Sequence, residues 1–340
     1  MNTRSRRNMV QVMLAGGAVV AAAPLTRAFA QEATPSASPV AAEFPLTVTT
    51  ANGTTELAAA AERVVALSFP DVDTVVALGV TPVGVQPDPF TETGIPVWLT
   101  DALLPDETTV LNITEEVPLE DVVALNPDLI IDTLGSRSAS VFDTMNAIAP
   151  TLSGLPELQV DVVTDRTRLI GQLLGKSAEA EAVLASVDAG IEAFKAEFPQ
   201  LDGTTFAFGT VRSAEAIGVI REDSHFAVQL FSRFGMSVTP ALRSDDRELQ
   251  GTAGAVSISL EEIQLIESDV VFLAYGSAEV QAEIEASPLY QSLSTVQRGN
   301  FIAIPLEMAT AMNVPSVANI PWTLDQLRKM FNGLDFVREG

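Results

Sequence analysis

Two acidic residues at matching places in a repeated sequence pattern are the first candidates for a functional role. Residues 117–131 read VPLEDVVALNPDLII, and residues 258–272 read ISLEEIQLIESDVVF. Glu120 and Glu261 each stand in the first turn of a short predicted helix, where the helix dipole favours a carboxylate and solvent can reach it. Matching exposed carboxylates on two similar halves suit docking onto a partner, although a favourable first-turn charge would also account for each of them.

The sequence offers few groups for catalysis or for holding a bare metal ion. His225 is the single histidine, and the chain contains no cysteine. A zinc or manganese site with several imidazole or thiolate ligands therefore cannot be assembled, and the usual general base of an enzyme is nearly absent. No nucleophile elbow or Ser-His-Asp set is recognisable. We predict no catalytic residue, metal ligand or cofactor, and we expect His225 to be an ordinary residue of a loop or a helix start.

The charge balance of the chain bears on its partners. The sequence has 44 acidic and 19 basic residues among its 340, a net charge of −25. Nucleic acid and anionic membranes are poor partners for such a surface. A chain of this length favours about two domains, each with its own core.

Residues 1–30 have the features of a signal peptide. A basic start over residues 4–7 precedes an apolar stretch over residues 9–23 and a small-residue cleavage pattern at residues 28–30. The apolar stretch is short compared with the roughly 20 residues of a membrane-spanning helix. Residues 5–9 (SRRNM) also resemble a twin-arginine signal, so the Sec and twin-arginine routes both stay open. We expect an exported protein, in the periplasm or at the outer face of the cytoplasmic membrane, without a Cys lipid anchor.

Strand-like and helix-like segments alternate along the rest of the chain, which predicts an α/β protein with mostly parallel sheets. Predicted strands cover residues 63–67, 82–85, 129–132, 159–163, 205–211, 270–275 and 301–304, after a hairpin that turns at residues 52–53. Predicted helices cover residues 71–78, 119–125, 141–148, 226–234, 259–266 and 323–331, and a long helical stretch covers residues 165–197 with one break near residues 175–177. The predicted domains are a signal peptide (1–30), a disordered linker (31–43), an N-terminal α/β lobe (44–165), a bridging helix (166–198) and a C-terminal α/β lobe (199–340).

Several of these segments resemble one known family. Residues 63–85 and 119–131 are similar to the N-terminal lobe of the periplasmic substrate-binding proteins of ABC importers for ferric siderophores, haem and cobalamin. Residues 170–181, 259–261 and 315–327 resemble its bridging helix, its C-lobe signature and its terminal helix. The resemblance covers roughly residues 64–327 and implies two Rossmann-like lobes joined by a long rigid α-helix, with the ligand in the cleft between them.

The resemblance also implies partners. In this family a Glu at the start of one helix in each lobe contacts Arg residues of the permease, and Glu120 and Glu261 stand at the matching positions. The expected partners are therefore an ABC permease dimer with its ATPase and a ferric siderophore, bound by a monomeric receptor. Cobalamin or haem binding in the same fold, a ligand sensor and an exported enzyme are the alternatives.

The ligand is expected beyond the carboxyl ends of the strands, where open α/β sheets bind their ligands. The candidates are residues that follow predicted strands: Phe69, Trp98, Arg137, Arg212, Tyr275 and Met308. Guanidinium groups and aromatic faces suit the oxygen-rich, often anionic surface of a ferric siderophore. Surface ion pairs are the alternative for the two arginines, and Trp322 is expected to be a core residue.

Overall fold

The structure is a computed structural model, and it describes residues 43–50, 52–100, 102, 107–113, 116–134, 139–155, 162–244 and 254–334. The predicted signal peptide, almost all of the predicted linker and Arg137 lie outside these residues. Within them, no helix is both long enough and apolar enough to cross a bilayer.

The first half of the described chain, here called the N lobe, is built on a five-stranded sheet in which every paired neighbour runs parallel. Its strands, in the order β5-β4-β3-β6-β7, are β5 (Thr109–Val110), β4 (Gly84–Val85), β3 (Val64–Ala66), β6 (Leu129–Asp132) and β7 (Thr151–Ser153). The helices are α1 (Phe69–Ala77), α2 (Leu119–Ala124) and α3 (Ala139–Ile148). The predicted hairpin is present as β1 (Leu46–Thr50) and β2 (Gly53–Leu57), which pair antiparallel.

The second half, the C lobe, contains a six-stranded mixed sheet. Its strands are β8 (Thr205–Ser213), β9 (Ala216–Ile220), β10 (Ser237–Val238), β11 (Ala255–Ile258), β12 (Val270–Tyr275) and β13 (Phe301–Ile304). Its helices are α6 (Phe226–Arg233), α7 (Pro240–Arg243), α8 (Ala278–Ala286), α9 (Pro288–Gln291), α10 (Ser294–Gln297), α11 (Leu306–Asn313) and α12 (Asn319–Phe331), with 3-10 turns η1 (Pro199–Leu201) and η2 (Leu260–Ile266). Strands β8, β12 and β13 run parallel. At one edge β9 pairs antiparallel with β8, and β11 pairs antiparallel with β9.

The repeated sequence pattern performs the same structural task in both lobes. Asp128 stands just before β6 and accepts hydrogen bonds from the backbone N–H groups of Glu62 and Arg63, at 2.9 and 2.8 Å. Asp269 stands just before β12 and accepts from the backbone N–H and the hydroxyl of Thr205, at 2.7 and 2.8 Å. In each lobe the aspartate therefore fixes the start of the neighbouring parallel strand, β3 or β8.

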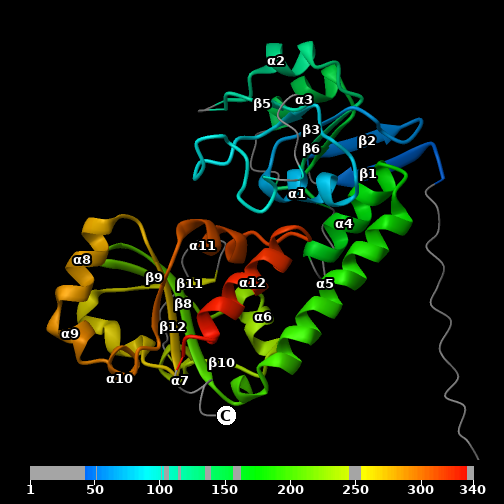
Figure 1. The fold of residues 1–340 in the computed structure, drawn as a ribbon. Coiled ribbons are helices and arrows are strands. Elements are labelled where there is room, and N and C mark those ends of the chain that lie inside the picture. Colours follow the sequence, from blue (N-terminus) through cyan, green and yellow to red (C-terminus); the bar gives the residue numbers. More distant parts are fainter. Residues whose placement is uncertain are drawn as a thin grey trace, which may run out of the picture. The chain divides into compact units, whose positions relative to one another are not determined.

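Two helices, α4 (Val162–Leu173) and α5 (Ser177–Glu197), lie between the lobes in the sequence (Figure 1). The break expected near residues 175–177 is present, because Gly175 adopts φ +65° and ends α4. The chain then turns back so closely that a Cβ on Gly171 would come within 2.7 Å of the Ala180 side chain. The long helical stretch is thus two helices packed side by side, and α5 is the connecting helix.

Helix α5 contributes side chains to both hydrophobic cores. Ala180, near its start, is buried in the N-lobe core with Ile170 of α4. Ile191 and Phe194, near its end, are buried in the C-lobe core. At about 1.5 Å per residue, its 21 residues extend about 30 Å. One continuous helix anchored in both cores connects the lobes.

Two predicted elements differ from the structure. The strand predicted over residues 159–163 is wrong at Val162 and Val163, which begin α4, while residues 159–161 lie outside the described part. The β-branched valines resemble a strand, but Val163 is buried as part of a helix that continues to Leu173. The helix predicted over residues 259–266 is a 3-10 helix, closed at its start by a capping box between Ser259 and Glu262.

Candidate ligand-binding site

A cavity of about 640 Å³ lies at the carboxyl ends of β12 and β13. Its C-lobe walls come from the ends of these two strands and from the first turns of α8 and α11, and Phe90 reaches it from the N lobe. The residues that line it are Phe90, Tyr275, Gly276, Ser277, Ala278, Gln281, Ala303, Ile304, Pro305, Leu306 and Glu307. This is where parallel α/β sheets place their ligands, because the strand ends open into loops there.

Among the predicted site residues that the structure describes, Tyr275 is the one that lines this cavity. It ends β12, is only 8% exposed, and its hydroxyl has no hydrogen-bond partner among the described residues. Burial raises the pKa of this phenol, so the group is neutral and can donate a hydrogen bond. A buried hydroxyl without a partner costs free energy, and a ligand that accepts its hydrogen bond would recover that cost.

Arg212 lies beside the same strand end. Its neighbour Val211 pairs with Tyr275 across the sheet, and the Val211 carbonyl accepts the Gly276 N–H at 2.9 Å. The Arg212 side chain is exposed, and within the described ranges no acidic residue forms an ion pair with it. The strand continues to Ser213, so Arg212 is a strand residue rather than the first loop residue that the sequence predicts.

One acidic residue, Glu307, is among the residues that line the cavity. Glu307, in the first turn of α11, lines the cavity together with Phe90. The Phe90 backbone N–H donates to Asp88 at 2.8 Å, and Asp88 is only 4% exposed. Burial and, to a smaller extent, the charge of Glu307 raise the pKa of Asp88. Sequence patterns offer no reason to pair these two acids, because they are far apart in the chain and belong to different lobes.

Trp98, predicted to be a cleft aromatic residue, packs between the lobes and is not among the residues that line the cavity. Its ring centroid lies 5.3 Å from that of Trp322, and its Nε1 hydrogen is donated to Asp73 at 2.9 Å. Trp322 packs against the C-lobe core, as predicted. The two tryptophans therefore report on the contact between the lobes.

A buried polar network continues from Asp73 along α1. Asp71, fully buried, accepts hydrogen bonds from Ser68 and from the backbone N–H and hydroxyl of Thr133. The Arg166 guanidinium, 3% exposed, donates to the Thr133 hydroxyl at 2.9 Å and to the Pro315 carbonyl at 3.1 Å. Burial raises the pKa of Asp71, and the nearby Arg166 opposes that shift. Asp71 and Arg166 hold α1 and α4 against the segment that precedes α12.

The remaining predicted ligand contacts are placed differently. Phe69 is half-buried at the start of α1 and does not line the cavity. Met308 is fully buried in the C-lobe core on α11, a position suited to packing rather than to ligand contact. His225 begins α6 as predicted: its Nδ1 accepts the Ala227 N–H at 3.1 Å, and its Nε2 pairs with Asn313 at 3.1 Å.

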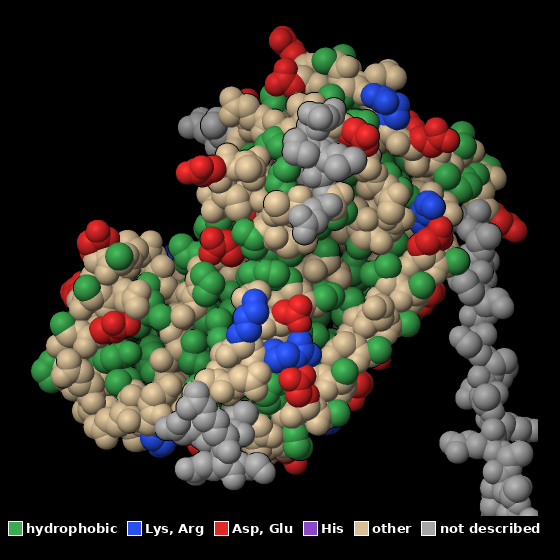
Figure 2. All heavy atoms as spheres, viewed as in Figure 1, with side chains coloured by type: hydrophobic (Ala, Val, Ile, Leu, Met, Phe, Trp, Pro, Cys, Tyr) green, Lys and Arg blue, Asp and Glu red, His purple; other side chains and the backbone are tan. Residues whose placement is uncertain are grey.

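The two predicted docking residues occupy equivalent places. Glu120 is exposed in the first turn of α2, and Glu261 is exposed in the first turn of η2. Each precedes, in the chain, the aspartate that accepts a backbone hydrogen bond at the start of a neighbouring strand in the same lobe, Asp128 or Asp269. The matched positions that the repeat predicts are thus present at the surface of both lobes. Figure 2 shows further acidic side chains scattered over one face of the molecule.

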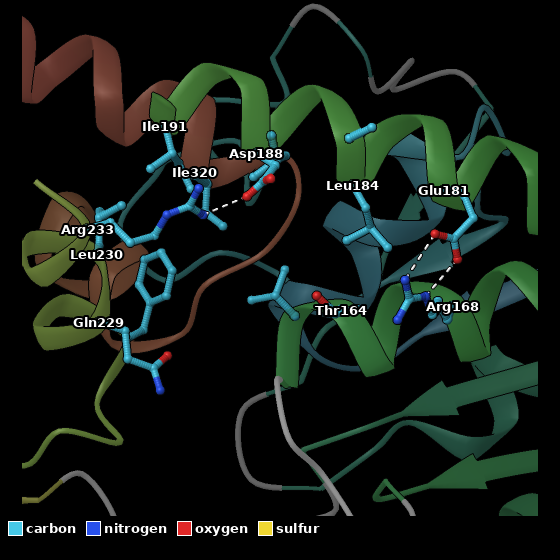
Figure 3. A pocket seen from close by; sticks show the side chains of 14 residues that line it. Thr164, Arg168, Glu181, Leu184, Asp188, Ile191, Gln229, Leu230, Arg233 and Ile320 are labelled. Atoms are coloured by element: carbon cyan, nitrogen blue, oxygen red, sulfur yellow. Dashed lines mark hydrogen bonds and ion pairs between the residues drawn. The ribbon is translucent and has the colours of Figure 1, made fainter. Parts of the chain in front are cut away.

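A second cavity, of about 430 Å³, lies among α4, α5, α6 and α12 (Figure 3). Arg168 is paired with Glu181 at its edge, at 2.7 Å, and Arg233 is paired with Asp188, also at 2.7 Å. These charged groups already satisfy one another. By contrast, the cavity at β12 is lined by Tyr275, whose buried hydroxyl has no partner in the described part of the chain, which makes it the stronger candidate for a ligand site.

Comparison with known proteins agrees with this geometry. Residues 64–307, well over half of the chain, match the family model of the periplasmic binding proteins. The chain belongs to this family of non-enzymatic binding proteins, and it is a substrate-binding protein of an ABC importer.

Two curated relatives are similar over most of their length. The Fe(3+)-citrate-binding protein YfmC of Bacillus subtilis is 26% identical over 249 residues, which are 73% of this chain and 74% of the relative. The Fe(3+) dicitrate-binding periplasmic protein FecB of Escherichia coli is 26% identical over 267 residues, 75% of this chain and 80% of the relative.

Solved structures share the fold. A periplasmic solute binding protein from Mycobacterium smegmatis superposes with a TM-score of 0.71 at 25% identity, over 85% of this chain and 98% of that one. SirA of Staphylococcus aureus, solved with staphyloferrin B, gives 0.65 at 22% identity, over 86% and 99%.

Proposed function

We propose that this protein captures a ferric siderophore in the cavity at the ends of β12 and β13 and delivers it to a membrane permease. The observation that carries the proposal is a cavity with largely apolar walls at these strand ends, lined by Tyr275, whose buried hydroxyl has no partner among the described residues. Ligand sites typically combine such walls with a few polar groups that fix orientation. Ferric siderophores present an apolar skeleton with oxygen atoms that accept hydrogen bonds.

The relatives support the same ligand class. YfmC and FecB are named for ferric citrate and ferric dicitrate, and another relative is named an achromobactin-binding protein. Arg212, an exposed cation one residue beyond the partner of Tyr275 on β8, remains part of the proposal because a guanidinium suits an oxygen-rich ligand, although it is not among the residues that line the cavity. Arg137, predicted to follow β6 into the same region, remains part of the proposal although it lies outside the described residues.

The proposal includes the partner and the location. Glu120 and Glu261 are proposed to contact Arg residues of a permease dimer, one carboxylate for each lobe, with a monomeric receptor. Export after removal of residues 1–30 to the periplasm or the outer face of the cytoplasmic membrane, a disordered linker over residues 31–43 and the lack of a Cys lipid anchor belong to the same proposal.

Tryptophan fluorescence of the protein from Gln31 onward, titrated with ferric complexes and their iron-free forms, tests the proposal. Trp98 and Trp322 lie at the contact between the lobes, so a ligand that changes this contact alters their emission. Calorimetric titration checks any ligand that leaves the emission unchanged. Submicromolar binding of a ferric complex, and not of its iron-free form, is the expected result. A folded protein that binds no member of a hydroxamate, catecholate and carboxylate panel would contradict the proposal.

A further inference from the structure

Asp73, on α1, connects two segments that each contribute to the walls of the cavity. One of its carboxylate oxygens accepts the indole hydrogen of Trp98, in the loop that follows β4, and the other accepts the hydroxyl hydrogen of Ser316, between α11 and α12. Phe90 of that loop and Leu306 of α11 both line the cavity. A single buried carboxyl group therefore joins the segments that build the cavity from the two lobes.

Both segments are braced by their own hydrogen bonds. In the loop, the Thr91 hydroxyl donates to the Ile95 carbonyl at 2.9 Å. In the C lobe, the Asn319 side chain donates to the Val314 carbonyl at 3.0 Å, and the Val314 N–H donates to the carbonyl of Thr310 on α11 at 2.8 Å. A shift at the junction is therefore passed along each segment toward the residues that line the cavity.

The surroundings of Asp73 disfavour its charged form. Its side chain is fully buried, and it accepts two hydrogen bonds from neutral donors, whereas an ionised carboxylate can accept about four. Within the described ranges no Lys or Arg forms an ion pair with it. Arg166, on α4, lies 3.9 Å from Asp71 instead and donates to the Pro315 carbonyl at 3.1 Å. Loss of a proton from Asp73 thus places an incompletely compensated charge in the junction.

The charged groups near Asp73 do not remove that cost. Arg166 favours the ionised carboxyl group, whereas Asp88, in the same loop as Trp98, opposes it. Residues 314–319 contain no ionisable side chain. Burial has the largest effect and raises the pKa of Asp73 to about 7.

We infer that Asp73, Ser316 and Arg166 form a latch between the lobes, and that the latch loosens when Asp73 loses its proton. When the junction parts, water reaches the carboxyl group and its pKa returns toward the usual value of 3.8. The latched state therefore binds the proton more tightly, so it is favoured most at low pH and loses this preference as the pH rises through 7. The inference goes beyond the proposed function, because it concerns the lobes themselves and not the identity of the ligand.

Hydrogen exchange of the purified protein, followed by NMR at pH 5.5 and pH 7.5, tests the latch from both sides. The reporters are the Trp98 indole hydrogen in the N lobe and, in the C lobe, the Ser316 backbone N–H, which donates to Asn319 at 2.9 Å. Each rate is compared with the intrinsic exchange rate at the same pH to give a protection factor. Asp73→Asn keeps the shape of the side chain without a titrating charge, and Asp143→Asn, at an exposed position on α3, is the matched control.

In the wild type both protection factors are expected to fall about tenfold between pH 5.5 and pH 7.5, because the latched state loses its preference for the proton over this range. In Asp73→Asn they should change by less than about twofold, whereas Asp143→Asn should behave like the wild type. Ser316→Ala should lower the protection of the Trp98 hydrogen about tenfold at both pH values, the effect of one lost hydrogen bond, and Ser316→Thr should restore it.

Wild-type protection factors that stay within about twofold over this pH range would overturn the inference. A pH effect of equal size in Asp73→Asn would overturn it as well, since another group would then be titrating. So would a change confined to the Trp98 hydrogen, because the motion would then lie within the N lobe. Failure to bind any ferric complex contradicts the proposed function alone, because the latch is measured without ligand.

Discussion

Ser316 donates its hydroxyl hydrogen to Asp73, although 243 positions separate the two residues in the chain. Both side chains are at most 1% exposed. The other oxygen of Asp73 accepts the Trp98 indole hydrogen, and the Ser316 oxygen accepts the Asn319 N–H at 3.0 Å. A buried carboxylate on α1 is thus held in part by the segment that leads into α12, and this contact joins the two lobes away from α5.

Removing the hydroxyl is expected to weaken this junction. Ser316→Ala leaves one oxygen of Asp73 buried without its donor, which should lower the free energy of unfolding by about 1–3 kcal/mol. Urea unfolding at pH 8 measures the change. Ser316→Thr keeps the hydroxyl and is the control, expected to lose less than Ser316→Ala. An alanine variant as stable as the wild type would show that the contact contributes nothing to stability.

The same carboxylate predicts a pH dependence of stability. Burial raises the pKa of Asp73 from 3.8 to about 7, against the hydrogen bonds from Ser316 and Trp98 and the charge of Arg166. A carboxyl group whose pKa is higher in the folded state contributes stability that is complete below its unfolded pKa and is lost as the pH rises through the folded value. Asp73 should therefore favour the folded state near pH 5 more than near pH 8.

Comparison with Asp73→Asn isolates this contribution, because titrating groups elsewhere act almost equally in both proteins. Relative to the variant, the wild type is expected to lose about 2 kcal/mol of unfolding free energy between pH 5 and pH 7. Arg166 and Asp88 are the charged neighbours whose coupling to Asp73 will modify the value. If the difference in unfolding free energy between the wild type and Asp73→Asn stays constant from pH 5 to pH 7, the predicted titration of Asp73 is ruled out.

The repeated sequence pattern was a reliable guide because its aspartates act locally. Asp128 and Asp269 each bind the backbone at the start of a neighbouring strand, so the same short pattern produces the same arrangement in both lobes. Apolar runs likewise predicted β3, β6 and β12, whose side chains are buried throughout. Where a pattern acts through residues that are close in the chain, the sequence alone is sufficient to predict the local structure.

Contacts between distant residues could not be predicted in this way. Asp73 lies near the start of α1, and only the fold brings Ser316 and Trp98 to it. Tyr275 could be predicted as a site residue because it directly ends an apolar strand. Met308 follows β13 in the same manner, yet it lies on the inner face of α11 and is buried. Position after a strand identifies the region of a site but not the direction of each side chain.

Tyr275→Phe is expected to affect stability and binding in opposite directions. Losing a buried hydroxyl without a partner should leave the unfolding free energy unchanged or raise it by up to about 1 kcal/mol. Affinity for the ferric ligand should fall about fivefold to tenfold, because one hydrogen bond to the ligand is lost.

Thermal unfolding and calorimetric titration together test this prediction. Tyr290→Phe is the control, since Tyr290 is also buried but packs against Phe301 outside the cavity, with ring centroids 4.8 Å apart. It should leave affinity unchanged. Unaltered ligand affinity in Tyr275→Phe would remove this phenol from the binding site.

The docking proposal predicts loss of transport without loss of binding. Glu120→Ala and Glu261→Ala each remove one exposed carboxylate, so each should lower uptake of the ferric ligand about tenfold in cells that carry the cognate permease, the expected cost of one charge-assisted contact. Ligand affinity of the purified variants should equal that of the wild type, because neither residue lines the cavity. Glu56→Ala, an exposed acid on β2, controls for the loss of one charge. If both docking variants transport like Glu56→Ala, the two carboxylates are only favourable first-turn charges, and the permease must recognise another surface.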